Sequence, residues 1–309
     1  MTDTLTVRKD LVLAFGDRDD GALGIPTLTK DGEVIETSYF YGTTRPKNII
    51  VVSSQAGCPM KCAFCELGSA RFGRSLSPEE MRDQALLMLG QAALHGFDAS
   101  STPHKITVAN SGEPLLNSHL TDGLNLLAGI PVRSFKVSTV LPESRIASET
   151  LVQLASFAAS QARPVQLQIS LISTSEEARL CISGGKVAGF ARIREVGELW
   201  RAANPHGRKV NLSLIITSDM PCNARDVAAM FPPELFRFRF REYVPTKNGE
   251  GKGLRVISAA RLAEIKKDFG DHGYEVTDWA SPSLIERKFS LAANVIRKLY
   301  LDMTSHVLG

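Results

Sequence analysis

The chain has 309 residues, of which 43% are hydrophobic and 22% charged, a composition that excludes a disordered or fibrous protein and allows a sizeable core. Its formal net charge of +3 is too small to argue by itself for a surface that binds nucleic acid through many phosphates. The sequence starts without a secretory signal and has no apolar run long enough to cross a bilayer, so we expect a cytoplasmic protein with no membrane partner.

Runs rich in β-forming residues alternate with segments long enough for a helix, which is typical of a parallel sheet with crossover helices. The predicted strands are 48–54, 105–110, 134–140, 165–172, 210–217 and 236–244. The predicted helices between them are 77–96, 120–129, 147–161, 186–203 and 223–230. Right-handed crossovers would curl these units into an α/β fold, a partial (βα)6 barrel of the TIM type, with ligands at the carboxyl ends of the strands.

Two smaller parts flank the predicted barrel of residues 46–250. Residues 1–45 contain a β-rich run, 34–40, after Asp31 and Gly32, which predicts a β-hairpin extension. Residues 251–309 form a C-terminal extension with a predicted helix at 259–269, a strand at 274–278 and a second helix at 284–300.

Three of the five cysteines, Cys58, Cys62 and Cys65, lie within eight residues directly after the first predicted strand. Such crowding indicates metal ligation, and thiolates suit zinc or an iron–sulfur cluster. Closed sites generally use four ligands, and Cys181 or Cys222 could supply the fourth. We favour a cluster with three protein thiolates and one open iron; structural zinc and three unrelated buried thiols are the alternatives.

The spacing Cys-x3-Cys-x2-Cys on a loop after the first strand resembles the radical S-adenosylmethionine (SAM) superfamily, and the resemblance covers residues 48–245. It implies a [4Fe-4S] cluster held by Cys58, Cys62 and Cys65, with SAM chelated at the open iron. It also implies an external electron donor such as flavodoxin or ferredoxin. Reductive cleavage of SAM would then give a 5'-deoxyadenosyl radical that abstracts a substrate hydrogen.

Within that superfamily, further motifs resemble the RlmN/Cfr class of RNA-adenosine methyltransferases. These motifs are the segments 53–58, 72–76, 112–117, 169–171 and 175–179. The resemblance implies that the Gly-Glu-Pro motif holds the amino group of SAM, that an aromatic packs near its adenine and that two strand serines contact its polar groups. The residues at these positions are Gly112, Glu113, Pro114, Phe64, Ser138 and Ser170.

These residues also have plainer interpretations. The Gly-Glu-Pro motif ends the second strand, where glycine allows close backbone approach and a carboxylate can receive an ammonium group. A simple strand-ending turn is the alternative use of Gly and Pro. Buried aromatics usually serve the core, and serines in strands are often only tolerated.

The resemblance breaks at the two further cysteines with which this class carries out methylation. The upstream position, seven residues before Cys58, is Val51, and an ungapped match puts Ser290 near the C-terminal position. Valine cannot accept a methyl group, and a serine hydroxyl is a far poorer nucleophile than a thiolate. An asparagine with which the family helps to bind SAM at the sixth strand is also replaced. Tyr243, Lys247 and Asn248 there face the ligand or belong to a solvated loop.

The segment 236–241 alternates Phe and Arg, which at the period of a strand points the arginines to one face. That face could be the inside of the barrel, where buried arginines need anionic partners. An internal salt bridge to Glu242, Glu113 or another acid is favoured over a phosphate or carboxylate substrate.

We therefore expect a radical SAM enzyme that abstracts hydrogen from a small molecule, such as a nucleoside, a nucleotide or another biosynthetic intermediate, and that is not a methyltransferase. An RNA adenosine-modifying enzyme is the first alternative, and a non-catalytic zinc-binding module is the second. The sequence assigns no acid–base catalytic residue.

Overall fold

The structure, a computed structural model, describes residues 4–7, 13–16, 20–42, 48–96 and 103–278. The predicted helix at 284–300 and Ser290 lie outside these residues. Across the described residues, eleven strands form one sheet in the order β1-β3-β4-β5-β6-β7-β8-β9-β10-β11, with β2 paired to β3.

All six predicted barrel strands are present and run parallel to one another. They are β5 (Ile49–Val52), β6 (His104–Val108), β7 (Val132–Thr139), β8 (Val165–Ile172), β9 (Val210–Ile216) and β10 (Phe236–Glu242). The predicted strand near the C-terminus is β11 (Val276–Asp278), which pairs parallel with β10. The parallel part of the sheet therefore continues beyond the sixth strand.

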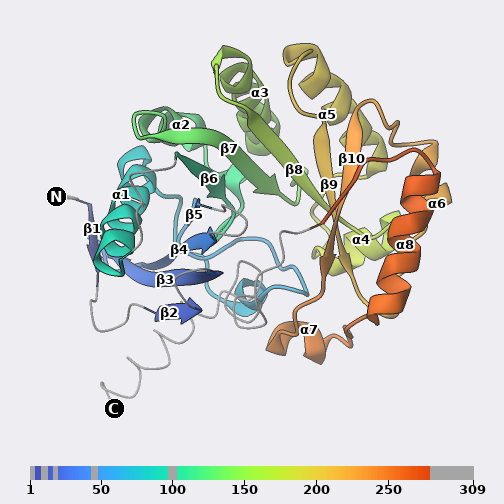
Figure 1. Cartoon of the computed structure of the whole chain (residues 1–309), viewed down its shortest axis with the longest axis horizontal. Helices are drawn as coiled ribbons and strands as arrows, with labels where there is room; N and C mark the ends of the chain where they lie inside the picture. Colours follow the sequence, from blue (N-terminus) through green and yellow to red (C-terminus); the bar gives the residue numbers. More distant parts are fainter. Residues whose placement is uncertain (1–3, 8–12, 17–19, 43–47, 97–102, 279–309) are drawn as a thin grey trace.

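Helices cover the outer side of the curved sheet, and its concave side faces the middle of the molecule (Figure 1). The predicted helices appear as α1 (Pro78–Leu94), α2 (Leu120–Leu127), α3 (Arg145–Ser160), α5 (Phe190–Ala203), α6 (Arg225–Ala228) and α8 (Ala259–Asp271). Two short helices were not predicted, α4 (Glu176–Ile182) and α7 (Lys247–Gly251). Both lie near the carboxyl ends of the strands (Figure 1).

The predicted hairpin is confirmed as β3 (Asp20–Thr29) and β4 (Val34–Gly42), which pair antiparallel. β4 also pairs antiparallel with β5, so the hairpin extends the barrel sheet. Two short strands, β1 (Leu5–Val7) and β2 (Leu13–Gly16), pair with β3. The division into residues 1–45, 46–250 and 251–309 stays a prediction.

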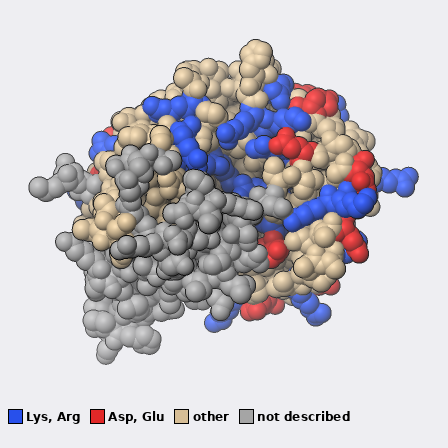
Figure 2. Space-filling view, in the orientation of Figure 1, with Lys and Arg blue, Asp and Glu red and all other residues tan. Residues whose placement is uncertain are grey.

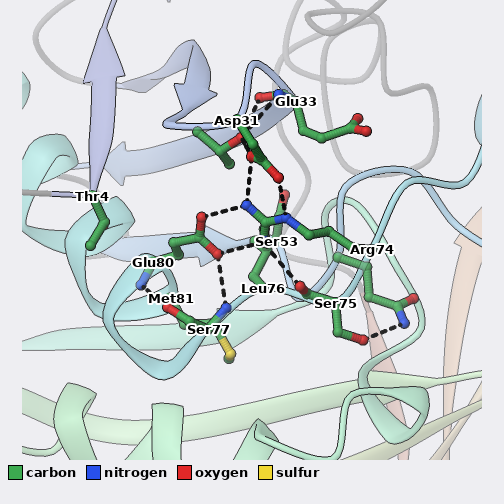
Figure 3. A network of polar contacts seen from close by, with 12 residues as sticks. Thr4, Asp31, Glu33, Ser53, Arg74, Ser75, Leu76, Ser77, Glu80 and Met81 are labelled. Carbon is green, nitrogen blue, oxygen red and sulfur yellow. Dashed lines mark hydrogen bonds and ion pairs between the residues drawn. The ribbon is translucent and has the colours of Figure 1, made fainter.

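The hairpin turn is tied to the start of α1 by Arg74 (Figure 3). Its guanidinium donates to Asp31 at 2.6 Å and to Glu80 at 2.8 Å. Glu80 also accepts from the backbone of Ser77 while Ser77 Oγ accepts from the Glu80 N–H, which together form a capping box at this N-terminus. The hydrogen bonds from Arg74 hold the pKa of Asp31 well below its usual range.

The parallel strands present two different faces because successive side chains alternate. On the outer face, apolar side chains pack under the helices; for example, the rings of Phe238 and Phe269 lie 4.6 Å apart between β10 and α8. On the inner face, the alternate positions are polar, such as Lys136, Gln168 and Ser213. Along these strands the barrel therefore has an apolar shell and a polar interior.

Candidate active site

The three clustered cysteines lie in the loop that leaves β5, at the carboxyl end of the barrel strands. Cys62 is buried and Cys58 and Cys65 are partly exposed. All three line one pocket of about 110 Å³, together with side chains from β7, β8 and β10. This is the location that the sequence predicted for a cofactor.

The start of the cysteine loop requires glycine at Gly57. Its φ is +76°, and a Cβ added there would lie 2.3 Å from the carbonyl oxygen of Arg71. The segment around Arg74 runs beside this part of the loop, where Ala56 N–H donates to the Arg74 carbonyl and Gly73 N–H to the Ala56 carbonyl, both at 2.8 Å. The motif at 72–76 thus holds the entry of the cysteine loop.

The loop after β10 clamps the cysteine loop from the other side. The Asn248 amide donates to the carbonyls of Cys62, Ala63 and Cys65 at 3.2, 3.0 and 3.0 Å. Thr246 Oγ1 donates to the Phe64 carbonyl at 3.4 Å. Asn248 therefore positions the loop that carries the thiols, a role that its place in the sequence did not reveal.

Tyr243 and Lys247, which the sequence assigned either to the ligand or to a solvated loop, have different surroundings. The Tyr243 side chain is buried, and its hydroxyl accepts a hydrogen bond from the Thr246 N–H at 3.1 Å. Lys247 is exposed, and its backbone N–H donates to Glu66 at 2.5 Å. Both residues thus help to fix the clamping loop.

The end of α4 supports the same loop from below. The Ala63 N–H donates to the Ile182 carbonyl at 2.8 Å, and Cys62 Sγ lies 4.0 Å from the Ser183 carbonyl oxygen. The cysteine loop is thereby fixed by hydrogen bonds from three segments that are far apart in the chain.

The thiols of the pocket suit a cluster with several metal ions. Burial and the neighbouring cysteines raise the pKa of both the Cys58 and Cys62 thiols, so a bound metal would be needed to keep them as thiolates. Within the described ranges, no group of three or more His, Cys, Asp or Glu side chains is placed to hold a metal ion. In a [4Fe-4S] cluster each thiolate binds a different iron, so its ligands need not converge on one point.

The two other cysteines lie away from this pocket. Cys181 is exposed on α4, and Cys222 is buried in the main hydrophobic core. Burial raises the pKa of Cys222 to about 12, as for an inert thiol. Neither is among the residues that line the pocket, so the described structure gives no fourth thiol ligand.

The Gly-Glu-Pro motif follows β6 and reaches the pocket. Gly112 has a φ of +101°, and a Cβ there would lie 2.6 Å from Cβ of Gln55, so glycine is required. Gln55 Oε1 in turn accepts from the Glu113 N–H at 2.9 Å. Gly112 and Glu113 line the pocket, whereas Pro114 is buried at the start of the 3₁₀ helix Pro114–Leu116.

The Glu113 carboxylate is anchored to the end of β7. It accepts hydrogen bonds from Thr139 Oγ1 at 2.5 Å, from the Val140 N–H at 2.9 Å and from the Leu115 N–H at 3.1 Å. Burial raises its pKa to about 7 despite these hydrogen bonds. Glu113 thus joins β6 to β7 at the pocket as well as lining it.

The remaining predicted site residues also reach this pocket. Phe64, Ser138 and Ser170 line it with the cysteines. Phe64 packs on the small apolar cluster that contains Met60 and Cys62. The structure thus brings together every predicted site residue except Pro114, which lies behind the pocket.

A fully buried arginine that the sequence did not reveal shapes the pocket rim. Arg179 on α4 donates to the carbonyls of Val140, Ser170 and Ala188 at 2.6, 2.5 and 3.1 Å. It joins the carboxyl ends of β7 and β8. The only sequence signal for Arg179 was its place in the motif at 175–179.

The described helices include none with the length and apolar character that crossing a membrane would require.

Comparison with known proteins places the chain among RNA methyltransferase-like sequences, although no family model matches it. A probable dual-specificity RNA methyltransferase RlmN from Natranaerobius thermophilus is 32% identical over 276 residues, covering 84% of this chain and 71% of that protein. The same name is carried by a Synechococcus protein that is 37% identical over 39% of this chain. The RlmN of Desulfotalea psychrophila is 32% identical over 52% of this chain. The chain spans 34% and 43% of the lengths of these last two relatives.

Two solved structures share the fold. A radical SAM methyltransferase from Sphaerobacter thermophilus aligns with a TM-score of 0.71 at 21% identity, over 94% of this chain and 80% of that one. SuiB of Streptococcus suis, solved with SAM bound, aligns with a TM-score of 0.52 at 12% identity, over 78% of this chain and 52% of that one. Because the sequence identities are low, the similarity to these two structures shows the fold alone. The match to the Natranaerobius protein shows the family: the chain belongs to the RlmN-like radical SAM enzymes, a class that uses a [4Fe-4S] cluster and SAM.

Proposed function

We propose that Cys58, Cys62 and Cys65 hold the [4Fe-4S] cluster, and that the enzyme abstracts hydrogen from a small molecule without methylating RNA. When bound and reduced, the cluster and SAM supply a carbon-centred radical that takes a hydrogen atom from the substrate. We also propose that an external one-electron donor, such as flavodoxin or ferredoxin, reduces the cluster, and that the protein is cytoplasmic. The pocket with three thiols beside Gly112 and Glu113 supports this assignment.

The residues of this chain divide the work at the pocket. The three thiols would bind the metal cluster, and Asn248 fixes their loop. We assign Gly112 and Glu113 to the amino group of SAM, with Pro114 holding the turn behind them. Phe64, Ser138 and Ser170, which line the same pocket, would contact the rest of SAM. A pocket of this kind, with apolar walls and a few polar side chains, orients a ligand through those placed groups.

The position of Val51 is the observation that carries the proposal against methyl transfer. Val51 is fully buried in β5, where it packs with Ala22 and Phe40. A valine side chain has no nucleophile and cannot carry a methyl group. Cys181 is exposed and Cys222 lies in the core, so neither replaces the missing thiol at the pocket.

A labelling experiment tests this proposal directly. The anaerobically reconstituted enzyme would be reduced and supplied with SAM carrying a deuterated methyl group, an adenosine-containing RNA oligonucleotide and a panel of nucleosides and nucleotides. We expect no deuterated methyl group in the RNA. We also expect deuterium from a labelled small molecule to appear in 5'-deoxyadenosine. Deuterated methyl-adenosine in the RNA would overturn the proposal.

The names of the relatives favour one second candidate, an RNA adenosine-modifying enzyme. Binding of RNA through several phosphates would weaken steeply as salt increases, because each contact releases counterions. A titration of the RNA oligonucleotide at two salt concentrations distinguishes this candidate from the proposed one, for which RNA binding should be unmeasurable. The zinc-binding module is tested by metal analysis, since it would contain zinc and no iron.

A further inference from the structure

Two lysines on neighbouring strands point into the barrel beneath the pocket. Lys105 lies on β6 and Lys136 on β7, where Lys136 pairs with Thr107 and Lys105 with Ser134. Lys105 and Thr107 share a face of β6, so both lysines belong to the inner face, with Lys136 one step closer to the cysteines. Lys136 is only 8% exposed and lines the pocket.

Neither lysine amine forms a hydrogen bond or an ion pair with any part of the chain that the structure describes. Burying an ammonium group costs several kcal/mol unless an anion or hydrogen-bond acceptors compensate. Burial accordingly lowers the pKa of Lys105 to about 8 and that of Lys136 well below its usual range. Lys136, a buried amine without a partner in the described residues, is an energetic cost that the described fold does not offset, and the partly exposed Lys105 adds to that cost.

The arginines of β10 add positive charge to the same space. Arg237, Arg239 and Arg241 alternate with buried phenylalanines, and all three lower the pKa of Lys136 by repulsion. Arg237 is neutralised by Glu275 at 2.8 Å. Arg239 and Arg241 make contacts of their own. They therefore act on the two lysines only as neighbouring positive charge.

The acid that shares the pocket is already engaged. Both oxygens of Glu113 accept hydrogen bonds from residues at the start of the next turn and the end of β7. Gln168 Oε1, in contrast, is buried without a hydrogen-bond partner among the described residues, while its amide nitrogen donates to Ser138 at 3.4 Å. The pocket therefore offers cations for an anion and one acceptor for a hydroxyl group.

The space-filling view agrees with this distribution of charge. Figure 2 shows Lys and Arg side chains gathered around the recess in the middle of the face that looks into the barrel. A recess with one sign of charge concentrates ligands of the opposite sign.

We propose that Lys105 and Lys136 bind a phosphate group of the substrate at the floor of the barrel, with the substrate's hydroxyl-bearing part extending past Gln168 toward the cysteines. A phosphate dianion fits better than a carboxylate because it places two negative charges on one group, to match the two amines. This inference rests on the proposed function, because only that function makes the phosphate-bearing ligand a substrate. Phosphate binding itself requires neither SAM cleavage nor electron transfer.

The experiment is a calorimetric titration of the reconstituted holoenzyme with inorganic phosphate, with succinate as the carboxylate probe. Lys136→Met removes the buried amine at nearly constant volume, and Lys30→Met is the matched control at an exposed lysine of the hairpin turn. We expect the wild type and Lys30→Met to bind phosphate within twofold of each other. We expect Lys136→Met to bind it at least about tenfold more weakly, as for a lost charge-assisted contact. Succinate should bind at least tenfold more weakly than phosphate.

Thermal unfolding separates binding from a structural role. Without ligand, Lys136→Met should melt a few degrees higher than the wild type, because a buried amine without a partner has been removed. Phosphate should raise the melting temperature of the wild type and not that of Lys136→Met, and Lys136→Arg should keep part of the response.

Equal phosphate affinity in Lys136→Met and Lys30→Met would overturn the inference, as would tighter binding of succinate than of phosphate. Binding of an RNA oligonucleotide without any binding of inorganic phosphate would also overturn it and would favour the RNA-modifying candidate. Phosphate binding by an enzyme that does not cleave SAM would leave this inference standing and contradict the proposed function alone.

Discussion

The cysteine loop and the basic floor beneath it belong to the same barrel but are built in opposite ways. The loop is one continuous segment, and its backbone is held by hydrogen bonds from Asn248, from α4 and from the segment around Arg74. The floor is assembled from single residues of separate strands, and its lysines have no polar partner in the described residues. The hydrogen bonds of the fold thus satisfy the backbone of the loop that would hold the cofactor, whereas the lysines that would meet the substrate have no partner in the described residues.

That difference indicates what each region is for. A loop held by many hydrogen bonds keeps its ligands in place whether or not a cofactor is bound. Buried charges without partners lower stability, and proteins tend to keep such groups where a ligand completes them. Four measurements test this difference between the two regions.

The largest effect is expected from Cys62→Ala. Loss of one thiolate should lower iron content and reduce formation of 5'-deoxyadenosine more than about a hundredfold, since even changes outside the ligand set can cost 10- to 100-fold. Iron analysis and chromatography of the products measure both. Cys181→Ser, at an exposed thiol away from the pocket, is the control and should stay within twofold of the wild type. Equal losses in both variants would show that the cysteine loop has no special role.

Gly112→Ala should cost about 2–4 kcal/mol of unfolding free energy, because an added methyl meets Gln55 at 2.6 Å and the positive φ is strained for alanine. Gly90→Ala is the matched control, since Gly90 lies in α1 with nothing within 4 Å of an added Cβ. That change should stabilise the protein by roughly 0.5–1 kcal/mol. Urea denaturation measures both, and similar stabilities would contradict the close approach of Gly112 to Gln55.

Asn248→Ala should increase the rate at which a chelator removes iron by about ten- to a hundredfold, because three carbonyls of the cysteine loop lose their donor. Lys247→Ala is the control, since the Lys247 side chain is exposed and only its backbone contacts the loop. A rate unchanged in Asn248→Ala would mean that the loop is positioned without this clamp.

The smallest effect is a pH dependence of anion binding at the floor, measured with sulfate, which stays a dianion across the range. The charged form of Lys105 binds the anion, so the contribution of Lys105 to the affinity is present below its pKa of about 8 and is lost as pH rises above it, by up to about tenfold per unit. The groups that set this pKa include Arg133 on β7, Arg208 before β9, and Arg237 and Arg239 on β10. Lys105→Met should flatten the profile, and an unchanged profile would exclude Lys105.

The sequence predicted the parts of the molecule that depend on local pattern. The six parallel strands follow from the alternation of β-rich and helical segments, and the hairpin follows from its turn residues. The cysteine loop follows from its spacing. Helix α4 was missed although Ser175 caps it and two glutamates follow, because seven residues are too few for a periodic signal.

The unpredicted part of the site depends on contacts between distant segments. Arg179 is important only because Val140, Ser170 and Ala188 meet around it. Nothing in the sequence distinguishes Lys136 from other lysines, because its burial in the barrel depends on the strands that surround it. The basic strand β10 was noticed, yet the sequence could not show that its charges face two lysines.

The most direct test of the central claim is the formation of 5'-deoxyadenosine from SAM by the anaerobically reconstituted and reduced wild-type chain. We expect about four irons per chain, as for one [4Fe-4S] cluster, and 5'-deoxyadenosine that appears only with the reductant present. A chain that contains zinc or no metal after reconstitution, or that leaves SAM intact under reduction, would contradict the account.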